Sequence, residues 1–205
     1  PYEKQRIITC HIGNGGSITA IKDGKSVDTS MGMTPVEGLM MGTRSGDVDA
    51  GVLTYLMDKK HLDSAGVANL VNKKSGVAGI SGLSSDMRDI EAGVAAKNER
   101  AILALQMYEY RITKYIGAYA AALGGVDIIV FTGGVGENQT ITREAVCKPL
   151  AFMGVEIDPE INKQIHGTEC VISTPASKVK VVVIPTDEEY MIASDTKAVL
   201  SGKMQ

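Results

Sequence analysis

Three short turns have the composition of an anion-binding site. Residues 13–16 read Gly-Asn-Gly-Gly, residues 133–136 read Gly-Gly-Val-Gly, and residues 186–189 read Thr-Asp-Glu-Glu. Glycine lets the backbone approach a ligand closely, and the exposed amide groups of glycine-rich turns bind anions. Each turn follows an apolar segment, and ligands bind beyond the carboxyl ends of strands that lead into helices. Together the turns indicate a nucleotide, although each alone is also typical of a tight connection.

Two further polar stretches contain charged residues that could contact a phosphate. Arg44 lies between glycines, where its planar guanidinium could form paired hydrogen bonds with a phosphate or a carboxylate. Asp86 and Arg88 lie where a helix is expected to start. Each has a structural alternative, because a loop arginine commonly forms a surface ion pair and Asp86 with Asp89 has the spacing of a capping-box variant.

Two familiar phosphate motifs are excluded by their spacing. Gly24-Lys25-Ser26 resembles the end of a Walker loop, but that motif requires a glycine five residues earlier, where the sequence has Thr19. Residues 133–136 do not form GxGxxG, so a dinucleotide site of the Rossmann type loses support.

Metal-binding signals are limited to the acidic turn. Glu188 and Glu189 could hold a metal, or could complement a helix N-terminus, which is the commoner role. The three histidines share no metal-binding spacing, and we expect His61 and His166 to lie at the surface. The three cysteines are far apart and form no CxxC pair, which favours reduced, buried thiols and a cytoplasmic location: Cys10, Cys147 and Cys170.

The composition is that of one globular domain with a small partner. The 205 residues are 44% apolar, which is enough to bury a core. The net charge is −3 without a basic block, so neither a nucleic acid nor a membrane is expected as a partner. No apolar stretch reaches transmembrane length. The first residue is not Met, so a fragment, a processed product and an expression product all remain open.

The elements that must position these residues follow an α/β pattern. The sequence predicts strands at 6–12, 17–23 and 25–30, with a hairpin at Asp23-Gly24. It predicts a short helix after Thr34-Pro35 and further helices at 50–60, 63–74, 97–123 and from 140. Strands at 128–131 and 179–185 follow, and a capping box of Thr186 and Glu189 starts the last helix. We therefore expect an α/β domain with a mixed five-stranded sheet, three antiparallel strands then two parallel ones, and helices on both faces.

Five segments, in order and spacing, resemble the acetokinase family within the superfamily of acetate and sugar kinases, Hsp70 and actin. They read CHIGNGGS, VDTSMGMTPVEGLMMGTRSGDVD, SGLSSDMRDIE, VFTGGVGEN and IPTDEEYMIA, and the resemblance extends from about residue 6 to 200. The resemblance implies a ribonuclease H-like, actin-like ATPase domain. Family enzymes are roughly twice as long, so residues 1–205 resemble their C-terminal nucleotide-binding domain. An asparagine, an arginine, a catalytic aspartate and a second histidine of the missing half have no counterpart here.

The resemblance implies roles for individual residues. It places the phosphate-binding loop at His11, Gly13, Asn14, Gly15 and Gly16, and further nucleotide contacts at Asp86, Met87, Arg88, Gly133, Gly134, Val135, Gly136 and Asn138. Arg44 matches an arginine that holds the acetate carboxylate or stabilises the transferring phosphoryl group, and Pro35 matches the acetate methyl pocket. Glu188 matches the carboxylate associated with Mg²⁺ or Mn²⁺, while Asp187 replaces a common asparagine.

These matches imply an ATP:acetate phosphotransferase, which forms acetyl phosphate and ADP, with this half having little activity alone. Propionate or butyrate kinase is the nearest alternative. A non-catalytic nucleotide-binding and dimerisation module is an alternative of another class, in which Tyr108, Tyr115 and Tyr119 of the long helix form an interface. The resemblance also implies a cytoplasmic homodimer.

Overall fold

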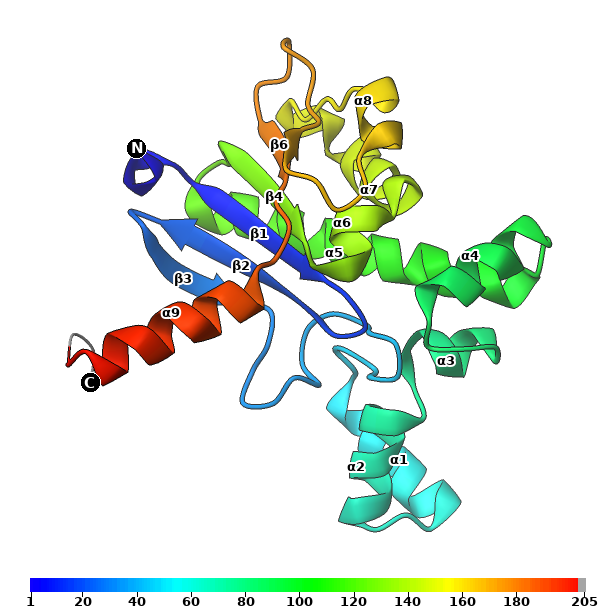
Figure 1. Cartoon of the computed structure of the whole chain (residues 1–205). Coiled ribbons are helices and arrows are strands. Elements are labelled where there is room, and N and C mark those ends of the chain that lie inside the picture. Colours follow the sequence, from blue (N-terminus) through cyan, green and yellow to red (C-terminus); the bar gives the residue numbers. More distant parts are fainter. Residues whose placement is uncertain (203–205) are drawn as a thin grey trace.

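A six-stranded mixed sheet forms the centre of the computed structural model, which describes residues 1–202 (Figure 1). The strand order is β3-β2-β1-β4-β6-β5. β1, β2 and β3 pair antiparallel, β1, β4 and β6 run parallel, and β5 returns antiparallel to β6. The strands are β1 (Ile7–Ile12), β2 (Gly16–Lys22), β3 (Lys25–Thr29), β4 (Ile128–Thr132), β5 (Cys170–Val171) and β6 (Lys180–Val183).

The sheet confirms the expected mixed arrangement but corrects the strand number from five to six. The additional strand, β5, has only two residues at the sheet edge, too few for an alternating pattern to be visible in sequence. β4 lies between β1 and β6, as its unbroken apolar run predicts. Asp23 and Gly24 both have positive φ (53° and 70°), so Gly24-Lys25-Ser26 belongs to a hairpin.

Helices connect and cover the strands. They are α1 (Ala50–Lys60), α2 (Ser64–Lys73), α3 (Gly76–Ser81), α4 (Met87–Ala95), α5 (Glu99–Leu123), α6 (Gly133–Asn138), α7 (Thr140–Cys147), α8 (Pro159–Gln164) and α9 (Glu188–Leu200), with 3-10 turns at Tyr2–Lys4 and Lys148–Met153. Aspartate and asparagine side chains cap the starts of several helices by accepting backbone N–H groups, as at Asp49, Asp63, Asp86 and Asn98.

Three local predictions were wrong. No helix follows Thr34-Pro35, where the chain forms irregular turns. The glycine-rich turn after β4 is itself a short helix, α6. The cap of α9 is Asp187, whose Oδ1 accepts the Tyr190 N–H, while Thr186 directs its hydroxyl to another partner.

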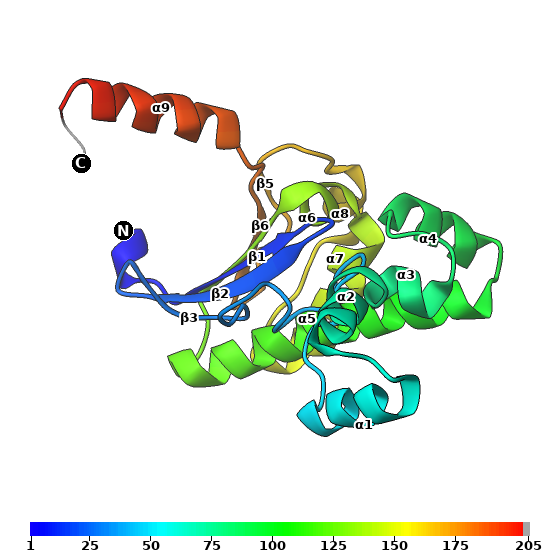
Figure 2. The same cartoon turned by 90° about the horizontal axis from the view of Figure 1, so that it is seen from below.

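The core lies between one face of the sheet and α5. Alternate residues of the central strands are fully buried on that face, including Ile8, Ile129 and Val181, and α5 runs across it (Figure 2). Tyr108 and Tyr119 belong to this core, so they are not the interface residues that the dimerisation alternative requires. The opposite face is half-buried, and α9 lies on that side with exposed side chains (Figure 2).

The topology brings the three candidate turns to one edge. β1, β4 and β6 are parallel neighbours, so the turns that follow them leave the same edge of the sheet. Within residues 1–202, no helix is long and apolar enough to cross a membrane.

Candidate functional site

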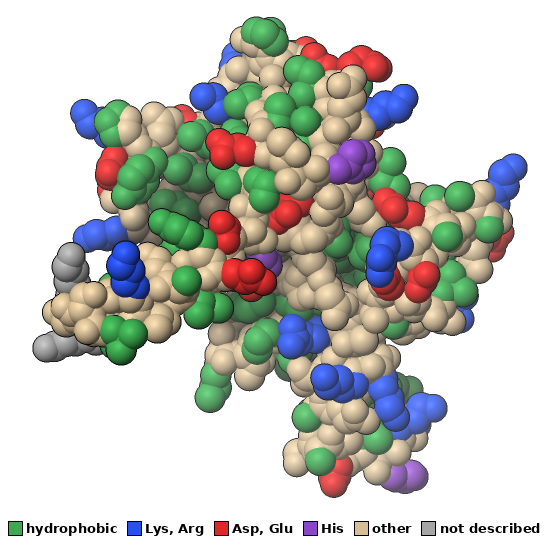
Figure 3. Space-filling view, in the orientation of Figure 1, with side chains coloured by type: hydrophobic (Ala, Val, Ile, Leu, Met, Phe, Trp, Pro, Cys, Tyr) green, Lys and Arg blue, Asp and Glu red, His purple; other side chains and the backbone are tan. Residues whose placement is uncertain are grey.

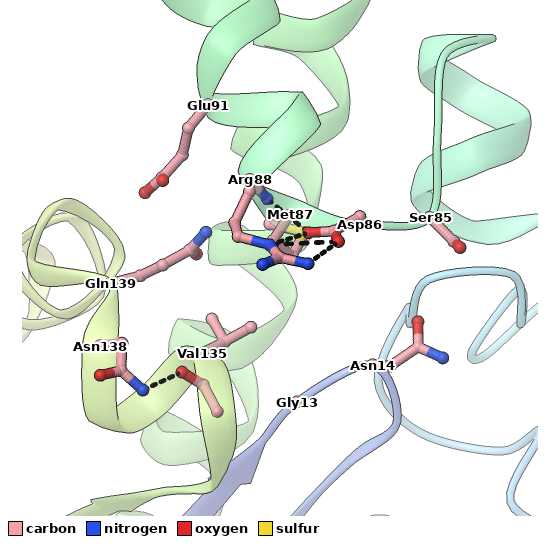
Figure 4. Close-up of a pocket in the computed structure, with 11 residues that line it drawn as sticks. Gly13, Asn14, Ser85, Asp86, Met87, Arg88, Glu91, Val135, Asn138 and Gln139 are labelled. Carbon is pink, nitrogen blue, oxygen red and sulfur yellow. Dashed lines mark hydrogen bonds and ion pairs between the residues drawn. The ribbon is translucent and has the colours of Figure 1, made fainter. Parts of the chain in front are cut away.

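Two adjoining cavities open at the carboxyl ends of β1, β4 and β6. The larger cavity, of about 650 Å³, is lined by Gly13, Asn14, Ser85, Asp86, Met87, Arg88, Glu91, Gly134, Val135, Asn138 and Gln139 (Figure 4). The acidic cavity, of about 490 Å³, is lined by His11, Gly133, Gly134, Thr186, Asp187, Glu188 and Glu189. Gly134 lines both cavities, so they adjoin at the turn that follows β4.

The first two turns are in direct contact because glycines allow it. The Gly13 N–H donates to the Gly15 carbonyl at 2.8 Å, which closes the first turn. Gly133 has φ +77°, and a Cβ there would lie 2.9 Å from the Ile12 carbonyl oxygen. Only glycine permits this conformation and this approach. The packing of the two turns by itself therefore requires glycine, whether or not a ligand binds there.

The loop that carries Arg44 is held against the first turn. The Gly42 N–H donates to the Asn14 carbonyl at 3.1 Å. A Cβ on Gly15 would lie 3.4 Å from Arg44 Nη1, so the guanidinium lies beside the first turn. Arg44 forms no ion pair among the described residues, and its guanidinium donates one hydrogen bond, to Met41 Sδ at 3.4 Å. The ion-pair alternative is therefore not supported, and the guanidinium can bind an anion.

Asp47 fixes the far end of that loop to the long helix α5. Its Oδ2 accepts hydrogen bonds from Arg111 Nη1 and from the Tyr115 hydroxyl, both at 2.7 Å. Its Oδ1 accepts the Gly38 N–H at 2.8 Å. These contacts limit how far Arg44 can move from the first turn.

Asp86 and Arg88 lie at the start of α4 and line the larger cavity, and their contacts with a nucleotide stay a prediction. Asp86 caps α4 by accepting the Arg88 N–H at 2.9 Å, and its carboxylate pairs with the Arg88 side chain at 2.6 Å. These hydrogen bonds lower the pKa of Asp86 to about 2. The Arg88 side chain is 86% exposed and lines the larger cavity, so the guanidinium is available to a ligand (Figure 4).

On the opposite wall, Val135 and Asn138 extend from α6. Asn138 Nδ2 donates to the Gly134 carbonyl at 2.9 Å, and Figure 4 shows the Val135 side chain pointing toward Arg88 across the cavity. Gly136 lies instead on the side of α6 that packs on β1 and β4, where an added Cβ would lie 3.6 Å from the Cys10 carbonyl oxygen. It contributes to the position of the turn and not to the cavity wall.

Four other residues implied by the resemblance do not line either cavity. Gly15 and Gly16 close the first turn and begin β2, and Arg44 lies behind Gly15. Pro35 is exposed within an irregular loop, next to the fully exposed Met33. The described residues therefore do not enclose an apolar pocket at Pro35.

The acidic cavity has the chemistry of an Mg²⁺–phosphate site. Figure 3 shows acidic side chains beside a histidine at the start of α9, where the cavity residues are His11, Asp187, Glu188 and Glu189. Among residues 1–202 no group of three or more His, Cys, Asp or Glu side chains has the arrangement of a metal centre. Mg²⁺ is commonly held by one or two carboxylates together with substrate phosphates, so Glu188 fits that role.

The remaining thiol and imidazole groups line neither cavity, although His166 Nδ1 lies 3.0 Å from the carbonyl oxygen of the cavity residue Asn138. Cys10 and Cys147 are buried, free thiols whose pKa values are raised by burial, and Cys170 is partly buried. His61 and His166 are exposed, as expected.

Sequence reasoning missed several residues of the site. Ser85, Glu91 and Gln139 line the larger cavity, and Glu137 connects two of the turns. All four lie in or next to the matched segments, but only the fold shows which residues of those segments line a cavity or join two turns. Glu137 in particular contacts Thr186, which is distant in sequence.

Comparisons with known proteins agree with this geometry. The sequence model of the acetokinase family matches residues 1–194. The acetate kinase of Parabacteroides distasonis is 67% identical over 203 residues, which cover 99% of this chain and 51% of that protein. The crystal structure of Porphyromonas gingivalis acetate kinase has a TM-score of 0.94 and 65% identity, covering 98% of this chain and 50% of that one.

A propionate kinase from Francisella tularensis is also similar, with a TM-score of 0.86, 40% identity, and coverage of 92% of this chain and 48% of that one. The chain thus spans about half the length of the relatives it matches. The match over residues 1–194 establishes that this chain belongs to the acetokinase family.

Proposed function

We propose that residues 1–205 are the C-terminal, nucleotide-binding domain of an ATP:acetate phosphotransferase, which forms acetyl phosphate and ADP. The observation that carries the proposal is that three turns lie at one edge of the sheet. The Arg44 guanidinium, which has no ion pair within residues 1–202, lies beside the first of them. The adenosine would occupy the larger cavity, between Arg88 and Val135. The phosphates would extend past Gly13 and Gly134 toward the acidic cavity.

Phosphoryl transfer depends on positioning and on stabilising the charge of the transferring group. Arg44 would supply a positive charge for that group or for the acetate carboxylate. Glu188 would hold Mg²⁺ or Mn²⁺, which would neutralise phosphate charge when bound. Since Asp187, Glu188 and Glu189 all face the same cavity, polyphosphate would be repelled there without a divalent cation.

Calorimetry of the 205-residue chain tests nucleotide binding directly. We expect MgADP and MgATP to bind at submillimolar to millimolar concentration, and ADP without a divalent cation to bind more weakly. The absence of MgADP and MgATP binding at millimolar nucleotide would contradict the proposal.

Two glycine variants show whether the cavities are the binding site. A Cβ on Gly134 would meet no atom within 4 Å, so Gly134→Val should fill the cavity without straining the fold. Blocking the cavity should weaken MgADP binding about 5- to 150-fold, since overpacking costs about 1–3 kcal/mol. Gly117→Val in α5, where a Cβ also meets nothing within 4 Å, is the matched control and should bind MgADP normally. Equal affinities of the two variants would place the nucleotide elsewhere.

Propionate is a second candidate acceptor because the similar Francisella tularensis structure is a propionate kinase. Pro35 is exposed in this chain, so its described surroundings do not set the size of an acyl pocket. Comparing kcat/KM for acetate, propionate and butyrate in an enzyme of full family length distinguishes these acceptors.

The cytoplasmic location and the homodimer are parts of the same proposal, supported by membership of the family. Because Tyr108 and Tyr119 are buried, a dimer surface on α5 would have to use its exposed residues, which include Leu103, Met107 and Tyr110. The non-catalytic module remains the alternative of another class.

A further inference from the structure

Glu137 joins two turns of the site through a single carboxylate oxygen. Its Oε1 accepts the Gly133 N–H at 2.8 Å, the Thr186 N–H at 2.9 Å and the Thr186 hydroxyl at 2.9 Å. Gly133 begins α6 after β4, and Thr186 precedes α9 after β6. One side chain therefore connects segments that are 49 residues apart in sequence.

The residues held by Glu137 line the acidic cavity. Gly133 and Thr186 are themselves part of the cavity wall, and Glu188 follows Thr186 by two residues. Gly133 also packs against the Ile12 carbonyl at the end of β1. Beyond the pairing of β1, β4 and β6, two contacts join the first turn to the acidic turn, Ile12 with Gly133 and Glu137 with Thr186.

The acidic turn has few other restraints. α9 has no buried residue, and Thr186, Asp187 and Glu188 are all exposed. Without the Glu137 carboxylate, the Thr186 N–H and hydroxyl would lose their partner and the turn could move away from Gly133. A metal ligand on such a turn is held in place by its neighbours, because partners behind a ligand orient it.

We propose that Glu137 is a positioning residue that fixes the Thr186–Glu188 turn against Gly133, so that Glu188 can hold a divalent cation on the nucleotide phosphates. This role rests on the proposed nucleotide and Mg²⁺ site. It predicts that Glu137 controls the Mg²⁺-dependent part of nucleotide affinity and leaves Mg²⁺-free affinity nearly unchanged.

The test compares Glu137→Ala, Glu137→Gln and the wild-type chain by calorimetry with ADP, with and without Mg²⁺. Glu137→Ala should weaken MgADP binding about 10- to 100-fold, as is typical when a residue behind a metal ligand is removed. Its affinity for Mg²⁺-free ADP should stay within about threefold. Glu137→Gln retains an oxygen acceptor but no charge, so it should keep MgADP affinity within about threefold.

The glutamine variant separates positioning from simple attraction of the cation. Equal losses in Glu137→Gln and Glu137→Ala would mean that charge alone matters and would overturn the proposal. Glu144→Ala, which removes an exposed glutamate of the neighbouring α7, is the matched control and should bind both forms normally.

Hydrogen exchange supplies a readout that needs no ligand. The Thr186 amide should be protected in the wild type and in Glu137→Gln, and should exchange much faster in Glu137→Ala. A wild-type chain that binds no nucleotide would reject the proposed function. Two outcomes with a wild type that binds MgADP would reject only the role of Glu137. In the first, Glu137→Ala binds MgADP as well as the wild type does. In the second, it loses affinity for MgADP and for Mg²⁺-free ADP by the same factor.

Discussion

Arg143 is fully buried and has no carboxylate partner among the described residues. Its guanidinium donates to Asn162 Oδ1 and to three backbone carbonyls, those of Gly136, Asn162 and Ile165, at 2.8–3.0 Å. Burial lowers its pKa to about 10, so the side chain still carries its charge at neutral pH. Arg143 thereby fastens α6, which forms part of the cavity wall, to α7 and α8.

We expect Arg143→Met to destabilise the fold strongly. Methionine fills much of the volume but donates to none of the four oxygen acceptors, so four largely buried hydrogen bonds are lost at a cost of about 3–5 kcal/mol. Urea unfolding followed by circular dichroism measures this loss. Lys148→Met, at an exposed lysine in the following 3-10 turn, should change the free energy of unfolding by less than about 0.5 kcal/mol. A loss below about 1 kcal/mol in Arg143→Met would show that the network contributes little.

At the residue scale, the sequence predicts turns and helix caps that depend on neighbouring residues, but it does not predict hydrogen bonds between residues far apart in the chain. The Asp23-Gly24 hairpin and the Asp86 cap depend on neighbours within a few positions, and both were predicted correctly. Glu137 and Arg143 each join a nearby residue to one that lies 19–49 positions away, so no local pattern identifies their roles. Thr186 shows the same limit, since its hydroxyl bonds to Glu137 and not to its own helix.

Among the elements, α5 and α7 meet through polar contacts beside the core. The Thr142 hydroxyl donates to Glu109 Oε1 at 3.3 Å, and the Thr113 hydroxyl donates to the Val146 carbonyl at 3.3 Å. Burial raises the pKa of Glu109 from 4.5 to about 7, and the bond from Thr142 opposes part of that shift. One of the groups between these two helices is therefore a carboxyl whose burial favours its protonated form.

The sign of this effect follows from linkage. The folded-state pKa of Glu109 lies above its unfolded value, so the stability it contributes is present below about pH 4.5 and is lost as the pH rises through about 7. Relative to Glu109→Gln, the wild type should lose about 1–2 kcal/mol of unfolding free energy between pH 5 and pH 8, after allowance for solvent screening. Urea titrations at the two pH values measure the difference. Glu144→Gln on α7 should track the wild type, and a pH-independent difference for Glu109→Gln would contradict the prediction.

Element prediction succeeded where periodicity was long and failed where the chain is irregular. The α5 prediction of 97–123 differs from the observed Glu99–Leu123 only at its start, because its apolar stripe spans several turns. The helix expected after Thr34-Pro35 does not form. There Gly38 has φ +102° and packs against the Ser30 carbonyl, a tertiary contact that overrides local propensity.

At the scale of the whole molecule, the two faces of the sheet differ in how far they are covered. One face of the sheet is covered by α5, whereas the opposite face is half-buried and α9 makes no buried contact. The chain matches about half the length of its relatives. A phosphotransferase site assembled only from the two cavities and Arg44 would lack the groups that the resemblance assigns to the other half.

We therefore expect the 205-residue chain to bind MgADP but to form little acetyl phosphate in a hydroxamate assay. A chimera that carries this chain in place of the matching part of the Parabacteroides distasonis acetate kinase should be active, because the two are 67% identical over 203 residues. In that chimera Arg44→Ala should lower kcat about 10²- to 10³-fold through lost charge stabilisation, with Lys73→Ala on α2 as the neutral control. Robust acetyl phosphate formation by the chain alone would contradict the first expectation. A folded chimera that binds MgADP but has no activity would instead favour the non-catalytic module. The cavities would then bind a nucleotide without any phosphoryl transfer for Arg44 to assist.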